Sequence, residues 1–334
     1  MAKGIVWVGT PFILNFENPM EFFQPLLEEG LEVRLDECRG HMPEEEVIKC
    51  LRDVTAVVAG AEPYTARVFE SAPNLQVVAR AGVGVNNVDI GAATARGVVV
   101  ANAAGTNSLS VAEHFFGLLL GTCRRIAWLN QNIRKGLWRE IQPAMRPLNG
   151  MTLGILGFGN IGKQVAKRAV AFDMKVIAND IAPDRKRAAE LGVEFVSKEE
   201  LARRSDYLTC HVPLTPLTRH IINRHILKLM KPDAFVFNTS RGPVFDLDAV
   251  AGALKDGTIR GAGIDVFPEE PPDYNHPIFS LENAVLTPHL GGRGEDAIRN
   301  TLAHAAQCVL DYFQGRKPST VVNPEVYEVL DQRA

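Results

Sequence analysis

Residues 151–162, "MTLGILGFGNIG", carry the clearest structural signal in this chain. It reads as a buried strand that runs into a turn containing Gly157, Gly159 and Gly162, and then into a helix. Glycines with this spacing permit a tight turn and let the backbone approach a pyrophosphate at the N-terminus of the helix. The segment therefore predicts a dinucleotide-binding βαβ unit.

The next expected strand supports this interpretation. "MKVIAND" (174–180) ends in Asp180, where a carboxylate can accept hydrogen bonds from both hydroxyls of an adenosine ribose and repel a 2′-phosphate. The sequence therefore favours NAD over NADP, although Arg185 is near enough in sequence to meet such a phosphate. The alternative interpretation is a glycine turn followed by a solvated aspartate.

Further strands are expected after this unit, with helical segments between most of them. They are "YLTCHV" (207–212), "AFVFNTS" (234–240), "IRGAGIDVF" (259–267) and "NAVLTPH" (283–289). Together with the first two they make six strands, a full dinucleotide-binding sheet. A long amphipathic helix is expected from about residue 295 to 315.

The first hundred residues show the same alternation of short β-branched runs and polar or helical segments. The runs are "GIVWVG" (4–9), "LEVRL" (31–35), "AVVAG" (56–60), "LQVVARAG" (75–82) and "GVVVANA" (97–103). This pattern predicts a second parallel sheet. An unusually apolar stretch follows at 108–126 and predicts a buried helix. The alternation of strands and helices in both halves predicts an α/β fold class, and a length of 334 residues favours two domains.

Composition argues against several function classes. The chain has 36 basic and 39 acidic residues and no basic block, which argues against nucleic acid and membrane-surface partners. Spanning a bilayer takes roughly 20 consecutive apolar residues, and no stretch is that long. The five cysteines form no CxxC pair and no metal-binding spacing, so we expect reduced thiols, a cytoplasmic protein and no metal. They are Cys38, Cys50, Cys123, Cys210 and Cys308.

Charged residues stand at the ends of three expected strands: Arg241, Asp265 with Glu269 and Glu270 beyond it, and His289. Ligands of open α/β sheets bind at the carboxyl ends of the strands, so these residues are expected to converge. Imidazole exchanges protons near neutral pH, and the guanidinium fork suits a bidentate grip on a carboxylate. The set predicts hydride transfer at a carbon that bears oxygen, with a small 2-hydroxy or 2-oxo acid as substrate. A structural histidine and a solvated acidic turn are the alternatives.

Several motifs in order resemble the D-isomer-specific 2-hydroxyacid dehydrogenases, most closely the D-3-phosphoglycerate dehydrogenase branch. They are "RAGVGVNNVDI" (80–90), "AAGTNSLSVAEH" (103–114), "GILGFGNIG" (154–162), "NTSRGPVFD" (238–246), "GAGIDVFPEEPP" (261–272) and "LTPHLGG" (286–292). The resemblance covers roughly residues 55 to 323. It implies an NAD-dependent oxidoreductase that acts on the CH–OH group of a D-2-hydroxy acid.

The resemblance also implies site residues. The catalytic set corresponds to Arg241, Glu270 rather than Glu269, and His289. The cofactor-binding residues correspond to Gly157, Gly159, Asn160, Ile161, Gly162, Asp180, Thr239, Ser240, Asp265, Gly291 and Gly292. The substrate-binding residues correspond to Val83, Gly84, Asn107 and Arg241.

The fold implied by the family is discontinuous. Residues 1–101 and 290–334 would form a flavodoxin-like substrate domain, and residues 102–289 a Rossmann NAD-binding domain. In such proteins the helix at 108–126 packs in a dimer interface, so a homodimer is expected. A helix buried within its own domain explains its apolar character nearly as well.

One departure from the phosphoglycerate dehydrogenase branch bears on the substrate. That branch commonly has a basic loop of the type R-S-x-T after the strand written here as "AVVAG", whereas this chain has Glu62 within residues 60–65. Like charge disfavours a phosphate, although Arg80 is a candidate to compensate. Glyoxylate or hydroxypyruvate reduction is therefore an alternative. An NADH-binding, co-repressor-like scaffold is a second alternative, because the family that the motifs resemble includes such proteins. We do not expect the C-terminal regulatory domain of longer relatives.

Overall fold

The computed structural model describes residues 3–36, 42–139 and 143–332. The chain divides into two compact units, residues 1–107 with 294–334 and residues 108–293. The breaks between the units fall a few residues beyond the expected boundaries at 101 and 290. Of the five cysteines, Cys38 lies outside the described residues, and the other four are free thiols.

Unit 1, residues 1–107 with 294–334, contains a five-stranded parallel sheet in the order β2-β1-β3-β4-β5. Its strands are β1 (Ile5–Val8), β2 (Glu32–Leu35), β3 (Ala56–Ala59), β4 (Val77–Arg80) and β5 (Val99–Ala101). This is the flavodoxin-like order, and all five strands lie within the runs predicted from the sequence.

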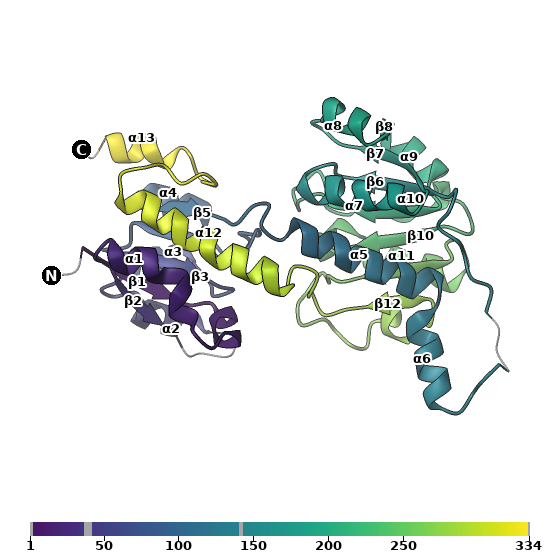
Figure 1. Cartoon of the computed structure of the whole chain (residues 1–334), viewed down its shortest axis with the longest axis horizontal. Coiled ribbons are helices and arrows are strands. Elements are labelled where there is room, and N and C mark those ends of the chain that lie inside the picture. Colours follow the sequence, from purple (N-terminus) through teal and green to yellow (C-terminus); the bar gives the residue numbers. More distant parts are fainter. Residues whose placement is uncertain (1–2, 37–41, 140–142, 333–334) are drawn as a thin grey trace. The chain divides into compact units, whose positions relative to one another are not determined.

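Helices cover this sheet. They are α1 (Gln24–Glu28), α2 (Glu44–Cys50), α3 (Ala66–Ser71), α4 (Ile90–Arg96), α12 (Glu295–Phe313) and α13 (Val326–Asp331), with 3₁₀ turns η1 (Pro11–Asn15) and η2 (Pro19–Phe23). The long helix α12 lies on β3 and β4 (Figure 1), where Leu302 and Val309 join the core around Val58 and Ala79. The C-terminal segment thus supplies part of the core of the N-terminal sheet.

Unit 2, residues 108–293, contains a seven-stranded parallel sheet in the order β12-β11-β10-β9-β6-β7-β8. Its strands are β6 (Thr152–Leu156), β7 (Lys175–Asn179), β8 (Glu194–Phe195), β9 (Tyr207–Cys210), β10 (Phe235–Asn238), β11 (Gly261–Ile264) and β12 (Ala284–Leu286). Read from β8, this is the Rossmann order with one additional strand. The sequence predicted six strands and missed β8, because two residues are too few to show a periodic pattern.

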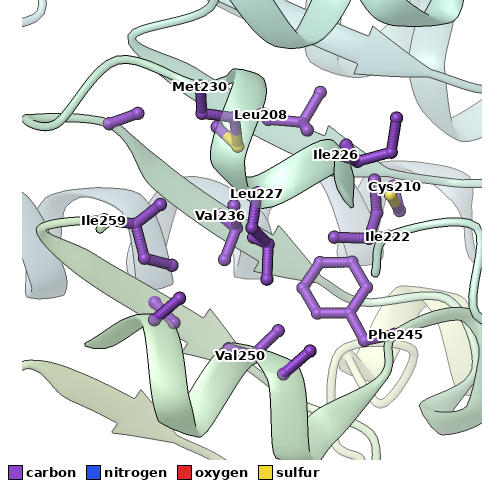
Figure 2. Packing of buried hydrophobic residues seen from close by; sticks show 14 of the residues in the cluster. Leu208, Cys210, Ile222, Ile226, Leu227, Met230, Val236, Phe245, Val250 and Ile259 are labelled. Carbon is purple, nitrogen blue, oxygen red and sulfur yellow. The ribbon is translucent and has the colours of Figure 1, made fainter. Parts of the chain in front are cut away.

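The helices of unit 2 cover both faces of its sheet. They are α5 (Ser108–Cys123), α6 (Ile126–Arg134), α7 (Asn160–Ala171), α8 (Arg185–Glu190), α9 (Lys198–Arg204), α10 (Arg224–Leu229) and α11 (Leu247–Lys255), with 3₁₀ turns η3 (Gly242–Val244) and η4 (Pro277–Ser280). Figure 2 shows one face, where Leu208 and Val236 of the sheet pack against Leu227 of α10 and Val250 of α11. On the other face Phe115 of α5 joins a core with strand and α7 residues.

The helix predicted at 108–126 is confirmed as α5, which ends three residues earlier than expected, and a second helix, α6, follows it. Helix α5 ends at Cys123, and Arg125 adopts a left-handed conformation with φ of 52° before α6 begins. Helix α5 is buried within its own unit against α7 and β11, as the second interpretation of its apolar character required. Helix α6 was missed because its sequence is more polar. Within the described residues, no helix is long and apolar enough to cross a membrane.

Candidate active site

The glycine turn lies between β6 and α7. Gly157 has φ of +96°, and a Cβ added to Gly162 would lie 2.3 Å from the carbonyl oxygen of Gly157, so both positions require glycine. A Cβ added to Gly159, which precedes α7, would meet no atom within 4 Å. The N-terminus of α7 therefore opens onto free space beside a bare backbone, which fits a pyrophosphate.

Asp180 follows β7 and lies beside this turn. Its Oδ2 accepts a hydrogen bond from the Phe158 amide at 2.6 Å, and its Oδ1 accepts one from the Ala182 amide at 2.8 Å. The expected ribose-binding carboxylate is thereby fixed next to the expected phosphate site. Arg185 is exposed at the start of α8. Together with the glycine turn, Asp180 gives the donor and acceptor set that fits NAD.

Arg241 stands directly after the buried pair Thr239 and Ser240 at the end of β10. Its Nη1 donates to the Ser240 carbonyl at 2.6 Å. A Cβ at Gly242 would lie 1.9 Å from the carbonyl carbon of Phe267, so only glycine allows this strand end to lie against the segment that leads to Glu270. Burial lowers the pKa of the Arg241 guanidinium, and the negative charge of Glu270 opposes that shift.

Glu270 and His289 form a close pair. Oε2 of Glu270 is 2.7 Å from Nδ1 of His289, and the side chains are 40% and 44% exposed, respectively. Oε1 of Glu270 accepts a hydrogen bond from the Phe267 amide at 3.1 Å. Partial burial raises the pKa of Glu270, but the contact with His289, the Phe267 amide and the charge of Arg241 outweigh it and lower the pKa. Glu270 is therefore a carboxylate at neutral pH.

The turn that carries His289 is fixed by Asp265, which follows β11 and is 1% exposed. Its carbonyl oxygen accepts from the His289 amide at 2.7 Å, and its Oδ2 accepts from the Gly291 amide at 2.9 Å. Gly291 is buried and Gly292 half-buried. His289 has φ of +55°, a left-handed conformation that a non-glycine residue adopts only where its surroundings enforce it.

Three residues in this region carried no role in the sequence analysis. His114 of α5 and Thr287 both contact the carboxylate of Asp265. His211 lies beneath the glycine turn, with Nε2 3.1 Å from Oγ1 of Thr209, and burial lowers its pKa to about 3. His211 is therefore neutral at physiological pH. The sequence places all three on or beside expected elements, but it does not show which faces of those elements meet.

The remaining expected residues, Val83, Gly84 and Asn107, belong to unit 1. The carbonyl oxygen of Val83 accepts from Nδ2 of Asn102 at 2.8 Å, which anchors the loop after β4. Gly84 and Asn107 are half-buried.

Glu62 is also in unit 1, within residues 60–65, and is only 6% exposed. Its Oε2 accepts from the Gly60 amide at 2.7 Å, and burial raises its pKa. Nε of Arg80 donates to Oδ1 of Asn87 at 3.1 Å, and its Nη1 donates to the Ala59 carbonyl at 3.3 Å. Glu62 therefore faces the protein interior, and Arg80 is engaged by the protein itself.

Comparison with known proteins decides the family. Residues 116–291 match the model described as D-isomer specific 2-hydroxyacid dehydrogenase, NAD binding domain. The chain belongs to the D-isomer specific 2-hydroxyacid dehydrogenase family. It is 39% identical over 312 residues to the glyoxylate reductase of Pyrococcus furiosus, covering 91% of this chain and 93% of that protein. The resemblance inferred from the sequence is confirmed.

Two further comparisons show the range of the family. The D-3-phosphoglycerate dehydrogenase of Methanocaldococcus jannaschii is 41% identical over 300 residues, which cover 89% of this chain and 56% of that protein. The crystal structure of D-lactate dehydrogenase from Aquifex aeolicus, complexed with NAD and lactic acid, aligns with a TM-score of 0.81 at 26% identity over 96% of this chain and 99% of that one. This chain is accordingly an NAD-dependent oxidoreductase that acts on CH–OH groups.

Proposed function

We propose that this dehydrogenase interconverts a small, unphosphorylated 2-oxo acid, such as glyoxylate or hydroxypyruvate, and the corresponding 2-hydroxy acid. The observation that carries the proposal is the Glu270–His289 pair, 2.7 Å apart, with the Arg241 guanidinium close enough for its charge to act on Glu270. Reduction of an oxo acid needs a group that exchanges a proton, here His289, and a group that holds the substrate carboxylate, here Arg241.

Glu270 determines which nitrogen of His289 carries the exchanged proton. A carboxylate only accepts hydrogen bonds, so the contact with Nδ1 keeps a proton on that nitrogen. Nε2 is then the position that gives a proton to the C2 oxygen during reduction and takes it back during oxidation. Glu270 also stabilises the ring in its charged form. NADH, when bound, would supply the hydride for C2, and with the proton from Nε2 the 2-oxo acid would gain one hydride and one proton.

Arg241 holds the substrate in this proposal. Its planar fork can donate two parallel hydrogen bonds to a carboxylate, and its burial strengthens that attraction because little water competes. For the cofactor, the proposed contacts are Gly157, Gly159, Asn160, Ile161, Gly162 and Asp180 at the pyrophosphate and ribose, and Thr239, Ser240, Asp265, Gly291 and Gly292 at the nicotinamide. In unit 1, we assign substrate contacts to Val83, Gly84 and Asn107.

The preference for unphosphorylated acids rests on residues 60–65. The segment "GAEPYT" contains no lysine or arginine, and its one charged side chain, Glu62, is buried. The next cations along the chain are Arg67 on α3 and then Arg80. Arg80 donates hydrogen bonds to Asn87 and to the Ala59 carbonyl. A substrate phosphate would therefore find no cation in this segment to offset its loss of hydration.

The first test is NADH oxidation by the purified protein with a matched pair of substrates, hydroxypyruvate and phosphohydroxypyruvate, which differ only in the phosphate. We expect kcat/KM to be higher for hydroxypyruvate by about 10²-fold, because taking a charged phosphate out of water without a partner is costly. Glyoxylate and pyruvate complete the panel.

Two contrary results would each indicate a different function for this protein. A preference for phosphohydroxypyruvate would make this a phosphoglycerate dehydrogenase, the second candidate, which the 41% identity to the Methanocaldococcus enzyme favours. NADH binding without turnover of any oxo acid would instead indicate a co-repressor-like scaffold.

We also propose a cytoplasmic homodimer in which α6 contributes to the interface. Helix α6 contains no buried residue, and several of its apolar side chains face solvent. Ile126 and Ile133 are 54% and 47% exposed, and Trp138 just beyond the helix is 71% exposed. Figure 1 shows α6 extending away from the sheet of its own unit. Clustered apolar side chains of this size favour burial against a second copy.

Light scattering on the eluted protein tests this assembly. We expect the mass of two chains for the wild type and of one chain for Ile133→Glu, because a charge buried in an apolar interface is costly. Leu217→Glu is the control: Leu217 is 87% exposed in a loop and should leave the mass unchanged. A monomeric wild type, or a dimer that tolerates Ile133→Glu, would contradict the assignment of α6.

A further inference from the structure

Four groups direct hydrogen bonds at the Asp265 carboxylate. Oδ1 accepts from Oγ1 of Thr287 at 2.6 Å and from the Leu290 amide at 3.0 Å, and Oδ2 accepts from the Gly291 amide at 2.9 Å. Nε2 of His114 lies 3.1 Å from Oδ1. Since a carboxylate has about four acceptor positions, this side chain is largely committed to holding the segment from Thr287 to Gly291.

The same contacts decide the tautomer of His114. Nε2 of His114 is 2.9 Å from Oγ1 of Thr287, and the single hydroxyl proton of Thr287 is directed at Asp265. Neither Thr287 nor the carboxylate can then donate to His114, so Nε2 must carry a proton and donate to them. A neutral imidazole fulfils this role, and no positive charge on His114 is required.

Helix α5 reaches the same segment at a second point. Oγ of Ser110 donates to the carbonyl oxygen of Gly291 at 2.8 Å. Ser110 and His114 are four residues apart, so both lie on one face of the helix. That face of α5 holds the turn on both sides of His289.

We propose that His114 is a positioning residue for the reaction: through Thr287 and Asp265 it fixes the turn that aims His289 at the substrate. The inference rests on the proposed role of His289. His289 holds a left-handed backbone conformation, with its amide donating to the Asp265 carbonyl, so its ring direction depends on the anchors of this turn. The contact is mostly buried, since the side chains of His114 and Asp265 are 24% and 2% exposed.

Removing the donor tests this role. In His114→Leu, Asp265 and Thr287 lose a hydrogen-bond donor, the turn relaxes, and kcat should fall by about tenfold or more, since a shift of about 1 Å in a reacting group can cost 10²-fold. KM should change by less than about threefold, because the proposed substrate contacts do not include His114. In His114→Gln, a side-chain amide can donate from nearly the same point, so kcat should stay within about threefold of the wild type.

Two further variants complete the experiment. Thr287→Val, which removes only a hydroxyl, should reduce kcat like His114→Leu, and the double variant should lose little more than either single variant because both break one network. His276→Leu is the control: it removes a histidine–aspartate contact of the same 3.1 Å length, to Asp248, and should leave kcat unchanged. Melting temperatures identify any variant that fails to fold.

A second readout does not depend on turnover. The ring proton resonances of His289, assigned by their loss in His289→Gln, should shift in His114→Leu and Thr287→Val but not in His114→Gln. Unmoved resonances in His114→Leu, an unchanged kcat, or an equal loss in His114→Gln would each overturn the proposal. Failure of the proposed function is a separate result, since it would appear as a wild-type protein that reduces no oxo acid.

Discussion

Replacing His289 with alanine is expected to reduce kcat by about 10²-fold or more, the range that general acid–base catalysis contributes. In the proposed reaction, the variant loses the Nε2 proton that the C2 oxygen would take during reduction. NADH affinity should remain nearly intact, because the glycine turn and Asp180 are untouched. Steady-state kinetics on the preferred oxo acid, with NADH fluorescence titration alongside, measures both quantities.

The control for this variant is His225→Ala, which removes an exposed histidine on α10. It should leave both kcat and NADH affinity unchanged. An unaltered kcat in His289→Ala would remove His289 from the chemistry. A joint loss of kcat and NADH affinity would point to a role in holding the cofactor instead.

Arg241→Lys should lower kcat/KM for the oxo acid by about 10²-fold, although the charge is kept. Lysine is a point charge without the planar fork, so it cannot make the two parallel hydrogen bonds assigned to Arg241. The loss should appear in KM as well as in kcat, since the substrate is held in the ground state and in the transition state. NADH affinity is again the reference quantity.

The matched control is Arg260→Lys in the same unit. Arg260 donates to Asp233 at 3.2 Å and to the Ala144 carbonyl at 2.8 Å, contacts within the protein that hold no substrate in the proposal. Its kinetics should match the wild type. If Arg241→Lys also matched the wild type, the substrate carboxylate would be held by other groups, and the loop around Val83 and Gly84 would be the next candidate.

Much of the fold followed from local patterns. The five strands of unit 1 and six of the seven in unit 2 are short β-branched or apolar runs bounded by turn residues, and such runs can be recognised in one sequence. Strand β8 and helix α6 were missed, because one is two residues long and the other is short and more polar than the apolar stretch before it. The sheet orders came with the family resemblance, since a strand's neighbours are not encoded in its own residues.

The site shows the same division. Strand-end positions predicted that Arg241, Asp265, Glu270 and His289 would converge, because the carboxyl ends of parallel strands meet at one edge. The orientation of Glu62 differs from the expectation. Its charge was expected to face a substrate phosphate, whereas its carboxylate is turned inward and accepts a hydrogen bond from the Gly60 amide. The identity of a residue gives its charge, but the course of the backbone determines which way its side chain is oriented.

The two parallel sheets, the dinucleotide turn and the family of this protein follow from the amino-acid sequence, because they depend on residue types at fixed short spacings. The contact of His114 with Asp265 is different: the two residues are 151 positions apart in the chain, and the 3.1 Å between the ring and the carboxylate is visible in the folded molecule alone. That contact requires α5 to pack on the sheet with one particular face. Helix packing is set by the combined shapes of many buried side chains, which no single motif records.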